Sequence, residues 1–360
     1  MACVYSSEYY SAIHMIKPLL NSSLIGLALF SSAHAHQGHE HAPKAKGMTE
    51  VVRTGNGTFT YENVLDWGKL PEDAKLGPTH GGVAVDKQGL IYVSTNGEKS
   101  IAVFKPDGTF VKALAPKARG IHGLQIVSEG DKEYLYGAQL GGDSKSKENL
   151  RALKIDLDGN IVMEIPNKNT GEIPGGVKGI TGIAVAPDGA IFVSMGYGSN
   201  LIHKFDKEGK LLKTFGGRGD ELEKFKTCHG LGIDTRFGEP RLLVCDRAKR
   251  RLVHLDLDGN WIGVHASNLR LPCAVSFHGD HVAVAELQAR VVIIDKAGTP
   301  VSFVGDNPNK KQWANFRVKN EEQTPGIFSA PHGLSFDATG NLYVQDWNAT
   351  GRVSKLTLVK

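Results

Sequence analysis

The sequence lacks long apolar runs, has few cysteines and shows no strong excess of one charge. Among its 360 residues, Lys and Arg number 42 and Asp and Glu 38, so the formal net charge is only +4, and the basic residues are scattered along the chain. Charge therefore gives no reason to expect a nucleic-acid partner, and we expect none. Because 41% of the residues are hydrophobic and 22% are charged, a disordered chain and a coiled coil are excluded as descriptions of the whole sequence.

The longest apolar segment, residues 19–30, is too short to span a bilayer. The small residues after it fit a cleavage pattern that ends at Ala35, and Met15 makes a better start than the first residue, so we predict a signal peptide over residues 1–35. No Cys stands at the cleavage site, so we expect no membrane anchor and a mature protein that is periplasmic or secreted. Residues 36–58 are rich in His but lack apolar periodicity, which predicts a disordered leader.

Only three cysteines lie beyond the predicted signal peptide: Cys228, Cys245 and Cys273. An odd number cannot form a complete disulfide framework. Cys228 and Cys245 lie within one repeat and are the candidate pair for a single bridge.

One phrase recurs six times, namely a short apolar strand, a turn with Asp and Gly, and a second apolar strand. Further short strands follow in each copy, and Asp and Gly supply the turn geometry between them. Four antiparallel strands per copy are typical of a propeller blade, so the sequence predicts an all-β, six-bladed β-propeller over residues 59–360. The residues at the start of the innermost strands are, in chain order, His80, His122, Thr181, His229, Cys273 and His332.

The last copy supplies only three clear strands. Residues 59–66 precede the first copy and are predicted to add the fourth strand, which would remove an exposed edge from the ring. The insertions at residues 141–151, 166–179 and 305–331 lengthen loops of the ring and are candidates for substrate contact.

Three histidines fall on alternate copies of the repeat. His122, His229 and His332 belong to blades two, four and six, so their imidazoles are expected to meet near the axis. Three imidazoles around one point are a typical zinc set that leaves one position open for a substrate or water. His80, from blade one, either closes this shell as a fourth ligand or lies behind the ligands.

Four phrases stand out for a different reason than their place in the repeat. They are His122-Gly-Leu, residues 195–202, His229-Gly-Leu followed by residues 244–247, and His332-Gly-Leu. Together they resemble the peptidyl-α-hydroxyglycine α-amidating lyases, which are six-bladed propellers of the NHL-repeat type, and the resemblance covers most of residues 59–358. It implies cleavage of the C–N bond of a C-terminal α-hydroxyglycine, with release of a peptide amide and glyoxylate.

The resemblance also implies roles for individual residues. His122, His229 and His332 would bind zinc, Tyr197 would act as the base, and Arg247 would bind the substrate. A zinc ion would stabilise the developing alkoxide while the tyrosine took its proton, and a guanidinium would hold a carboxylate.

Two positions depart from the family. Asn96 stands where the family has a second substrate-binding arginine. Asn96 is therefore the candidate substrate contact at that position, but it lacks the positive charge of the arginine. Gly333 follows His332 where the family has an Asp that contributes to a calcium site, so calcium is not carried over with zinc.

The leading interpretation is therefore an exported zinc-dependent lyase that acts as a monomer on a small-molecule or peptide substrate. The alternative is a non-catalytic NHL propeller that binds peptide or glycan, with a structural metal on the axis. A metal shell closed by His80 would favour that alternative. A lactonase-like hydrolase ranks below both, because no carboxylate or Asn occupies the six axial positions.

Overall fold

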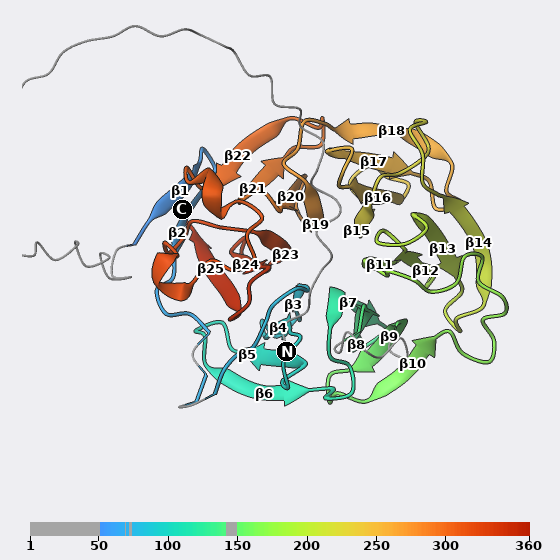
Figure 1. Cartoon of the computed structure of the whole chain (residues 1–360), viewed down its shortest axis with the longest axis horizontal. Coiled ribbons are helices and arrows are strands. Elements are labelled where there is room, and N and C mark those ends of the chain that lie inside the picture. The colour runs from blue at the N-terminus through green and yellow to red at the C-terminus, as the bar shows by residue number, and fades with distance from the viewer. Residues whose placement is uncertain (1–50, 69, 72–73, 142–149) are drawn as a thin grey trace, which may run out of the picture. The chain divides into compact units, whose positions relative to one another are not determined.

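The computed structural model describes residues 51–68, 70–71, 74–141 and 150–360. Its strands form six antiparallel sheets arranged as blades around an axis (Figure 1). This confirms the predicted all-β, six-bladed architecture. Helix in the described residues is limited to two 3-10 turns, η2 (Lys310–Gln312) and η3 (Asn320–Glu322). None of the helices there is long and apolar enough to cross a membrane.

Each blade runs from an innermost strand at the axis to an outermost strand at the rim. Blade one consists of β3 (Val83–Val85), β4 (Ile91–Ser94), β5 (Ile101–Phe104) and β6 (Phe110–Leu114). Blade two consists of β7 (Ile121–Glu129), β8 (Lys132–Gln139), β9 (Arg151–Asp156) and β10 (Ile161–Ile165). Blade three consists of β11 (Gly182–Val185), β12 (Ile191–Ser194), β13 (Leu201–Phe205) and β14 (Leu211–Gly216). Blade four consists of β15 (Cys228–Asp234), β16 (Arg241–Asp246), β17 (Arg251–Leu255) and β18 (Trp261–Ala266). Blade five is β19 (Pro272–His278), β20 (His281–Glu286), β21 (Arg290–Ile294), β22 (Pro300–Val304), and blade six is β23 (Pro331–Phe336), β24 (Leu342–Asp346), β25 (Arg352–Leu358), β2 (Phe59–Asn63), β1 (Arg53–Asn56).

The burial of each strand follows its place in the blade. Both middle strands of blade one are buried along their whole length, because neighbouring blades cover both faces of the sheet. The outermost strand β10 alternates instead, with Val162 50% exposed and Ile165 buried. The turns between strands use Asp and Gly as predicted: the Asp86 carboxylate accepts N–H groups from Gln88 and Leu90, and Gly89 has a φ of 85°.

The ring closes through the strand predicted for that purpose. Tyr61 of β2 stands opposite Leu358 of β25, so segments from both ends of the described chain share blade six. A further strand, β1, pairs with β2 and lies within residues 36–58, which were predicted to be a disordered leader. The predicted leader therefore extends too far along the chain. The main-chain N–H of Asn56 donates to the Ser302 hydroxyl and its side chain donates to the Val301 carbonyl, both in β22. Residues 36–50 of the predicted leader, and the predicted signal peptide, lie outside the described residues.

The candidate disulfide between Cys228 and Cys245 is wrong. Both thiols are free, as is that of Cys273. Cys228 stands opposite Asp246 in the β15–β16 ladder, so Cys245, one residue earlier, points to the other face of the sheet. The two side chains accordingly pack into different core clusters, one on each side of blade four.

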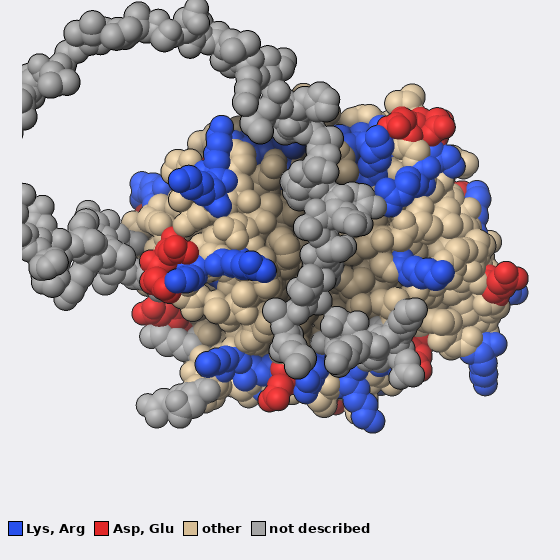
Figure 2. Space-filling model, in the orientation of Figure 1, with Lys and Arg blue, Asp and Glu red and all other residues tan. Residues whose placement is uncertain are grey.

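Charged side chains do not gather into one stripe on the face of the molecule shown in Figure 2. Lys and Arg lie in separate groups across this face and at its edge, with Asp and Glu beside some of them.

Candidate metal centre

Irregularities in the ladders turn four axial side chains toward the centre of the ring. The register shifts at His122 in β7, at His229 in β15, at Cys273 in β19 and at His332 in β23. A bulge of this kind lets one side chain leave the alternation of its strand and is common beside functional sites. All four side chains are at most 3% exposed.

The glycine after each axial histidine allows the blades to approach closely. A Cβ on Gly230 would collide with the Cys273 carbonyl oxygen and lie 2.9 Å from the Ala274 Cα, both main-chain atoms of the next blade. A Cβ on Gly333 would meet the main chain at Gly81 and Gly82 in the same way. The recurring His-Gly phrase therefore combines an imidazole with the small residue that allows neighbouring blades to bring the imidazoles together.

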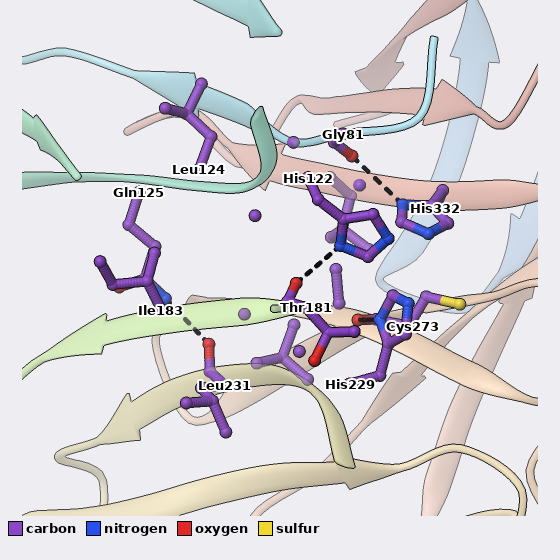
Figure 3. Close-up of a pocket in the computed structure, with 18 of the residues that line it drawn as sticks. Gly81, His122, Leu124, Gln125, Thr181, Ile183, His229, Leu231, Cys273 and His332 are labelled. Carbon is purple, nitrogen blue, oxygen red and sulfur yellow. Dashed lines mark hydrogen bonds between the residues drawn. The ribbon is translucent and has the colours of Figure 1, made fainter. Parts of the chain in front are cut away.

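The three threefold-related imidazoles do meet at the axis, as Figure 3 shows from one side. Their ring centroids lie 4.8 Å apart for His122 and His229, 4.5 Å for His122 and His332, and 4.8 Å for His229 and His332. His80 joins them, with its centroid 4.6 Å from those of His122 and His332.

Main-chain carbonyls set the tautomer of these three rings. Each Nδ1 lies near a carbonyl oxygen of the next blade, and because a carbonyl can only accept, Nδ1 carries the ring proton. Each Nε2 consequently keeps its lone pair. The pairs and their Nδ1–O distances are His122 with Thr181 at 2.7 Å, His229 with Cys273 at 2.7 Å and His332 with Gly81 at 3.4 Å.

These Nε2 lone pairs outnumber the proton donors near them. The Tyr197 hydroxyl lies 3.2 Å from Nε2 of His122 and 3.1 Å from Nε2 of His229, but its single proton can serve only one of them. Nε2 of His332 is buried with no hydrogen-bond partner. Buried acceptors rarely lack a donor, and imidazole nitrogens are preferred ligands of zinc, so the residues fit a divalent cation.

Burial keeps the axial imidazoles neutral. It lowers the pKa of His122 to about 3 and the pKa values of His80, His229 and His332 well below their ordinary value. The positive charge of Arg247 lowers each of these pKa values further. Neutral imidazoles are the form that binds metal.

Tyr197 and Arg247 lie together over this centre. Nη1 of Arg247 donates to the Tyr197 hydroxyl at 3.0 Å, and the guanidinium stacks 5.0 Å from the tyrosine ring. Burial opposes the charge of Arg247, but Tyr197 and Cys273 raise the pKa of the guanidinium above its ordinary value, so it stays cationic. The tyrosyl ring remains 38% exposed, which leaves it accessible to a substrate.

Asn96 is not joined to the imidazoles by any contact in the described part of the chain. It lies in the turn after β4, where its main-chain N–H donates to the Pro78 carbonyl at 2.8 Å.

Two side chains near the centre were missed as site residues. Cys273 was placed on the axis but given no role; its thiol and the ring nitrogens of His229 and His332 lie within 4.8 Å of one another, and His80, His122 and His332 form a second such group. Trp347 stacks 5.4 Å from the His80 ring and 5.0 Å from Phe316 of the insertion at residues 305–331. Alignment of the repeats could have found it, because Trp347 follows Asp346 in blade six as Arg247 follows Asp246 in blade four.

Buried acids hold the loops that lead into the histidine strands. The Asp346 carboxylate accepts the N–H groups of Ser329 at 2.9 Å and Ala330 at 2.6 Å, just before β23. Asp246 accepts the N–H of Lys226 at 2.8 Å, just before β15. In blades four and six, the acid at the end of the second strand therefore positions the loop that precedes the axial histidine of the same blade.

Comparison with known proteins bears on the fold. No protein-family model and no curated protein matches the sequence. Among solved structures, a streptogramin B lyase has a TM-score of 0.55 and 16% identity, covering 82% of this chain and 98% of that chain. A gluconolactonase from Xanthomonas campestris has a TM-score of 0.56 and 14% identity over 89% and 93% of the two chains, and a chain of a nidogen/laminin complex has a TM-score of 0.52 and 14% identity over 79% and 97%.

The protein is a six-bladed β-propeller. At these identities the likeness establishes that fold and no activity, since one propeller scaffold supports many functions. These propeller neighbours differ in kind and do not point specifically to the amidating lyases.

Proposed function

We propose that this propeller is a metal-dependent lyase that cleaves the C–N bond of an α-hydroxylated amide, of the type that acts on peptidyl-α-hydroxyglycine. His122, His229 and His332 would hold zinc, Tyr197 would transfer a proton, and Arg247 would bind a substrate carboxylate. The observation that carries the proposal is the surplus of buried imidazole lone pairs beside a hydroxyl and a guanidinium that already contact each other.

A zinc ion bound there supplies a Lewis acid that stabilises negative charge on an oxygen. The chain's own residues supply orientation and proton transfer. Arg247 forks onto the carboxylate and brings the hydroxyl-bearing carbon toward Tyr197. The tyrosine oxygen receives the proton of the substrate hydroxyl and passes its own proton to the departing nitrogen. The C–N electron pair stays with nitrogen and a C=O bond forms on carbon, so the products are an amide and an α-keto acid such as glyoxylate.

The sequence supports our proposal for where this activity takes place. The short apolar segment before Ala35 supports export to the periplasm or the outside of the cell, and we propose a monomer that takes a peptide or small-molecule substrate. Calcium has no proposed role.

The test combines metal analysis with an activity assay on the purified protein. We expect one zinc per chain and release of glyoxylate from a peptide extended by α-hydroxyglycine. His229→Ala should lose both, whereas His281→Gln, at the start of β20, should keep both. Protein without stoichiometric transition metal, or full zinc occupancy in His229→Ala, would overturn the proposal.

A non-catalytic propeller that binds peptide or glycan is the second candidate, and the place of His80 favours it. A nitrogen of His80 lies within 4.8 Å of nitrogens of His122 and His332, close enough to offer a fourth imidazole to the ion. Replacing His80 in a cobalt-loaded protein distinguishes the candidates. If His80 closes the shell, His80→Ala should admit water and change the cobalt spectrum; if it lies behind the ligands, the spectrum should keep its form.

A further inference from the structure

Cys273 occupies the axis at the same level as the histidines. It is the second residue of β19, as His332 is the second residue of β23, and the same kind of register shift turns it inward. The side chain is 1% exposed, and its sulfur lies within 4.8 Å of ring nitrogens of His229 and His332. Its thiol makes one long contact of 3.5 Å, to the Leu271 carbonyl. Figure 3 shows the sulfur beside the imidazoles of the pocket.

The charges around the centre favour an anionic ligand. The side chains that line the axial pocket include no carboxylate, and an imidazole that binds a metal ion through its nitrogen is neutral. A divalent ion would therefore lie beside the Arg247 cation with no formal negative charge among those lining groups. Desolvated charges of one sign are costly unless an anion offsets them. A thiolate is the one anionic ligand that the pocket lining can supply.

We propose that Cys273 is a ligand of the metal, making the resting centre three imidazoles and one thiolate. The inference rests on the metal centre of the proposed function and deepens it. Binding replaces the thiol proton, which leaves to solvent, with a metal–sulfur bond, and no oxidation or reduction takes place. Because zinc can expand from four to five ligands, a thiolate ligand would not exclude a substrate from the centre. The thiolate also favours borderline and soft ions over magnesium and calcium.

The decisive measurement is cobalt(II) titration of the full protein under reducing, anaerobic conditions. A cobalt–thiolate bond gives a near-ultraviolet charge-transfer band that imidazole ligands alone do not give. We expect that band to rise in proportion to bound cobalt up to one ion per chain. Cys273→Ser should abolish the band and weaken zinc binding by roughly 10- to 100-fold or more.

Cys228→Ala is the matched control. Cys228 is also a buried, free cysteine, but it packs in an apolar cluster formed by residues of blades three and four. It should keep the band and the metal affinity. X-ray absorption of the zinc-loaded wild type gives an answer that does not depend on any variant folding, and we expect one sulfur at about 2.3 Å.

The outcomes separate this inference from the proposed function. Stoichiometric cobalt without a charge-transfer band, or zinc without a sulfur neighbour, overturns the role of Cys273 and leaves the histidine centre intact. Failure of the protein to bind either metal overturns both.

Discussion

The main chain of the neighbouring blade fixes the tautomer of His122, His229 and His332. His122 and His229 use Nδ1 to bond a carbonyl at 2.7 Å, which leaves Nε2 for the centre of the ring. The Tyr197 hydroxyl then lies between two acceptors while its oxygen accepts a hydrogen bond from Arg247. A hydroxyl held in this way is already oriented for proton transfer before a substrate arrives.

Replacing Tyr197 tests that role directly. Tyr197→Phe keeps the ring and removes only the oxygen, so kcat for glyoxylate release should fall by about 10²- to 10⁴-fold. Zinc content and KM should change little, because the imidazoles and Arg247 remain. Steady-state kinetics with metal analysis check this, and Tyr197→Phe with wild-type kcat would remove the tyrosine from the reaction.

His203 should make stability depend on pH from a site far from the axis. It is buried in β13, with Nδ1 bonded to the Thr214 hydroxyl at 2.9 Å and Nε2 without a partner. Burial lowers its pKa to about 4, so below pH 6.5 the unfolded chain takes up a proton that the folded chain refuses. Stability from this group is complete above pH 6.5 and is lost as the pH falls toward 4, by roughly 3 kcal/mol.

Urea unfolding at pH 7.5 and 4.5 measures this effect. The free energy of unfolding should fall less on acidification in His203→Gln than in the wild type. His278→Gln, at a partly exposed position, serves as the comparison. Equal falls in His203→Gln and the wild type would contradict the prediction.

For individual residues, the repeat pattern of the sequence was enough to place His80, His122, His229 and His332 on the axis. It could not reveal which nitrogen each ring presents, because that depends on a carbonyl in a different blade. Nor could it assign Cys273 a neighbour, since the ring nitrogens of His229 and His332 that lie near its sulfur belong to other blades.

At the scale of the element, the innermost strands combine a bulge with a glycine. The bulge directs the side chain to the axis and the glycine admits the next blade, so ligand position and blade spacing depend on each other.

Gly230→Ala should therefore weaken both the fold and the metal site. The new Cβ would meet main-chain atoms of Cys273 and Ala274, which cannot swing away as a side chain could. We expect a loss of about 1–3 kcal/mol in the free energy of unfolding and a lower zinc affinity. Gly263→Ala in β18 is the control, because a Cβ there meets nothing within 4 Å, and its effect should stay within about 0.5 kcal/mol. Equal stability and zinc affinity in the two variants would refute the packing argument.

The strands themselves were predictable because their signals are local. Apolar runs of four or five residues and Asp-Gly turns mark nearly every strand, and residues 59–66 were correctly identified as the closing strand. The strand β1 was missed because its four residues, Arg53–Asn56, show no apolar alternation. Long-range bonds from Asn56 to Ser302 and Val301 help to hold it in place.

At the scale of the whole molecule, the ring depends on β2. Tyr61 is fully buried and packs in the cluster between blades five and six, so this strand contributes core as well as hydrogen bonds.

Truncation should show this dependence in steps. A chain that starts at residue 51 should fold, and one that starts at residue 58 should lose only the pairing of β1. A chain that starts at residue 64 exposes the edge of β25 and should unfold at a much lower temperature or aggregate. Thermal unfolding and size-exclusion chromatography make the comparison, and equal melting temperatures for the chains from 51 and from 64 would disprove it.

The pairing of Tyr61 with Leu358 also sets an order of events during synthesis. The earlier partner emerges first and must wait for nearly all of the remaining chain, so the blade that bears His332 is the last to be finished. A nascent or prematurely terminated chain has at most two of the three threefold-related imidazoles in place. If the centre binds the proposed ion, the complete set of imidazoles would become available only after translation of the ring is over, and an incomplete product would hold the ion less tightly.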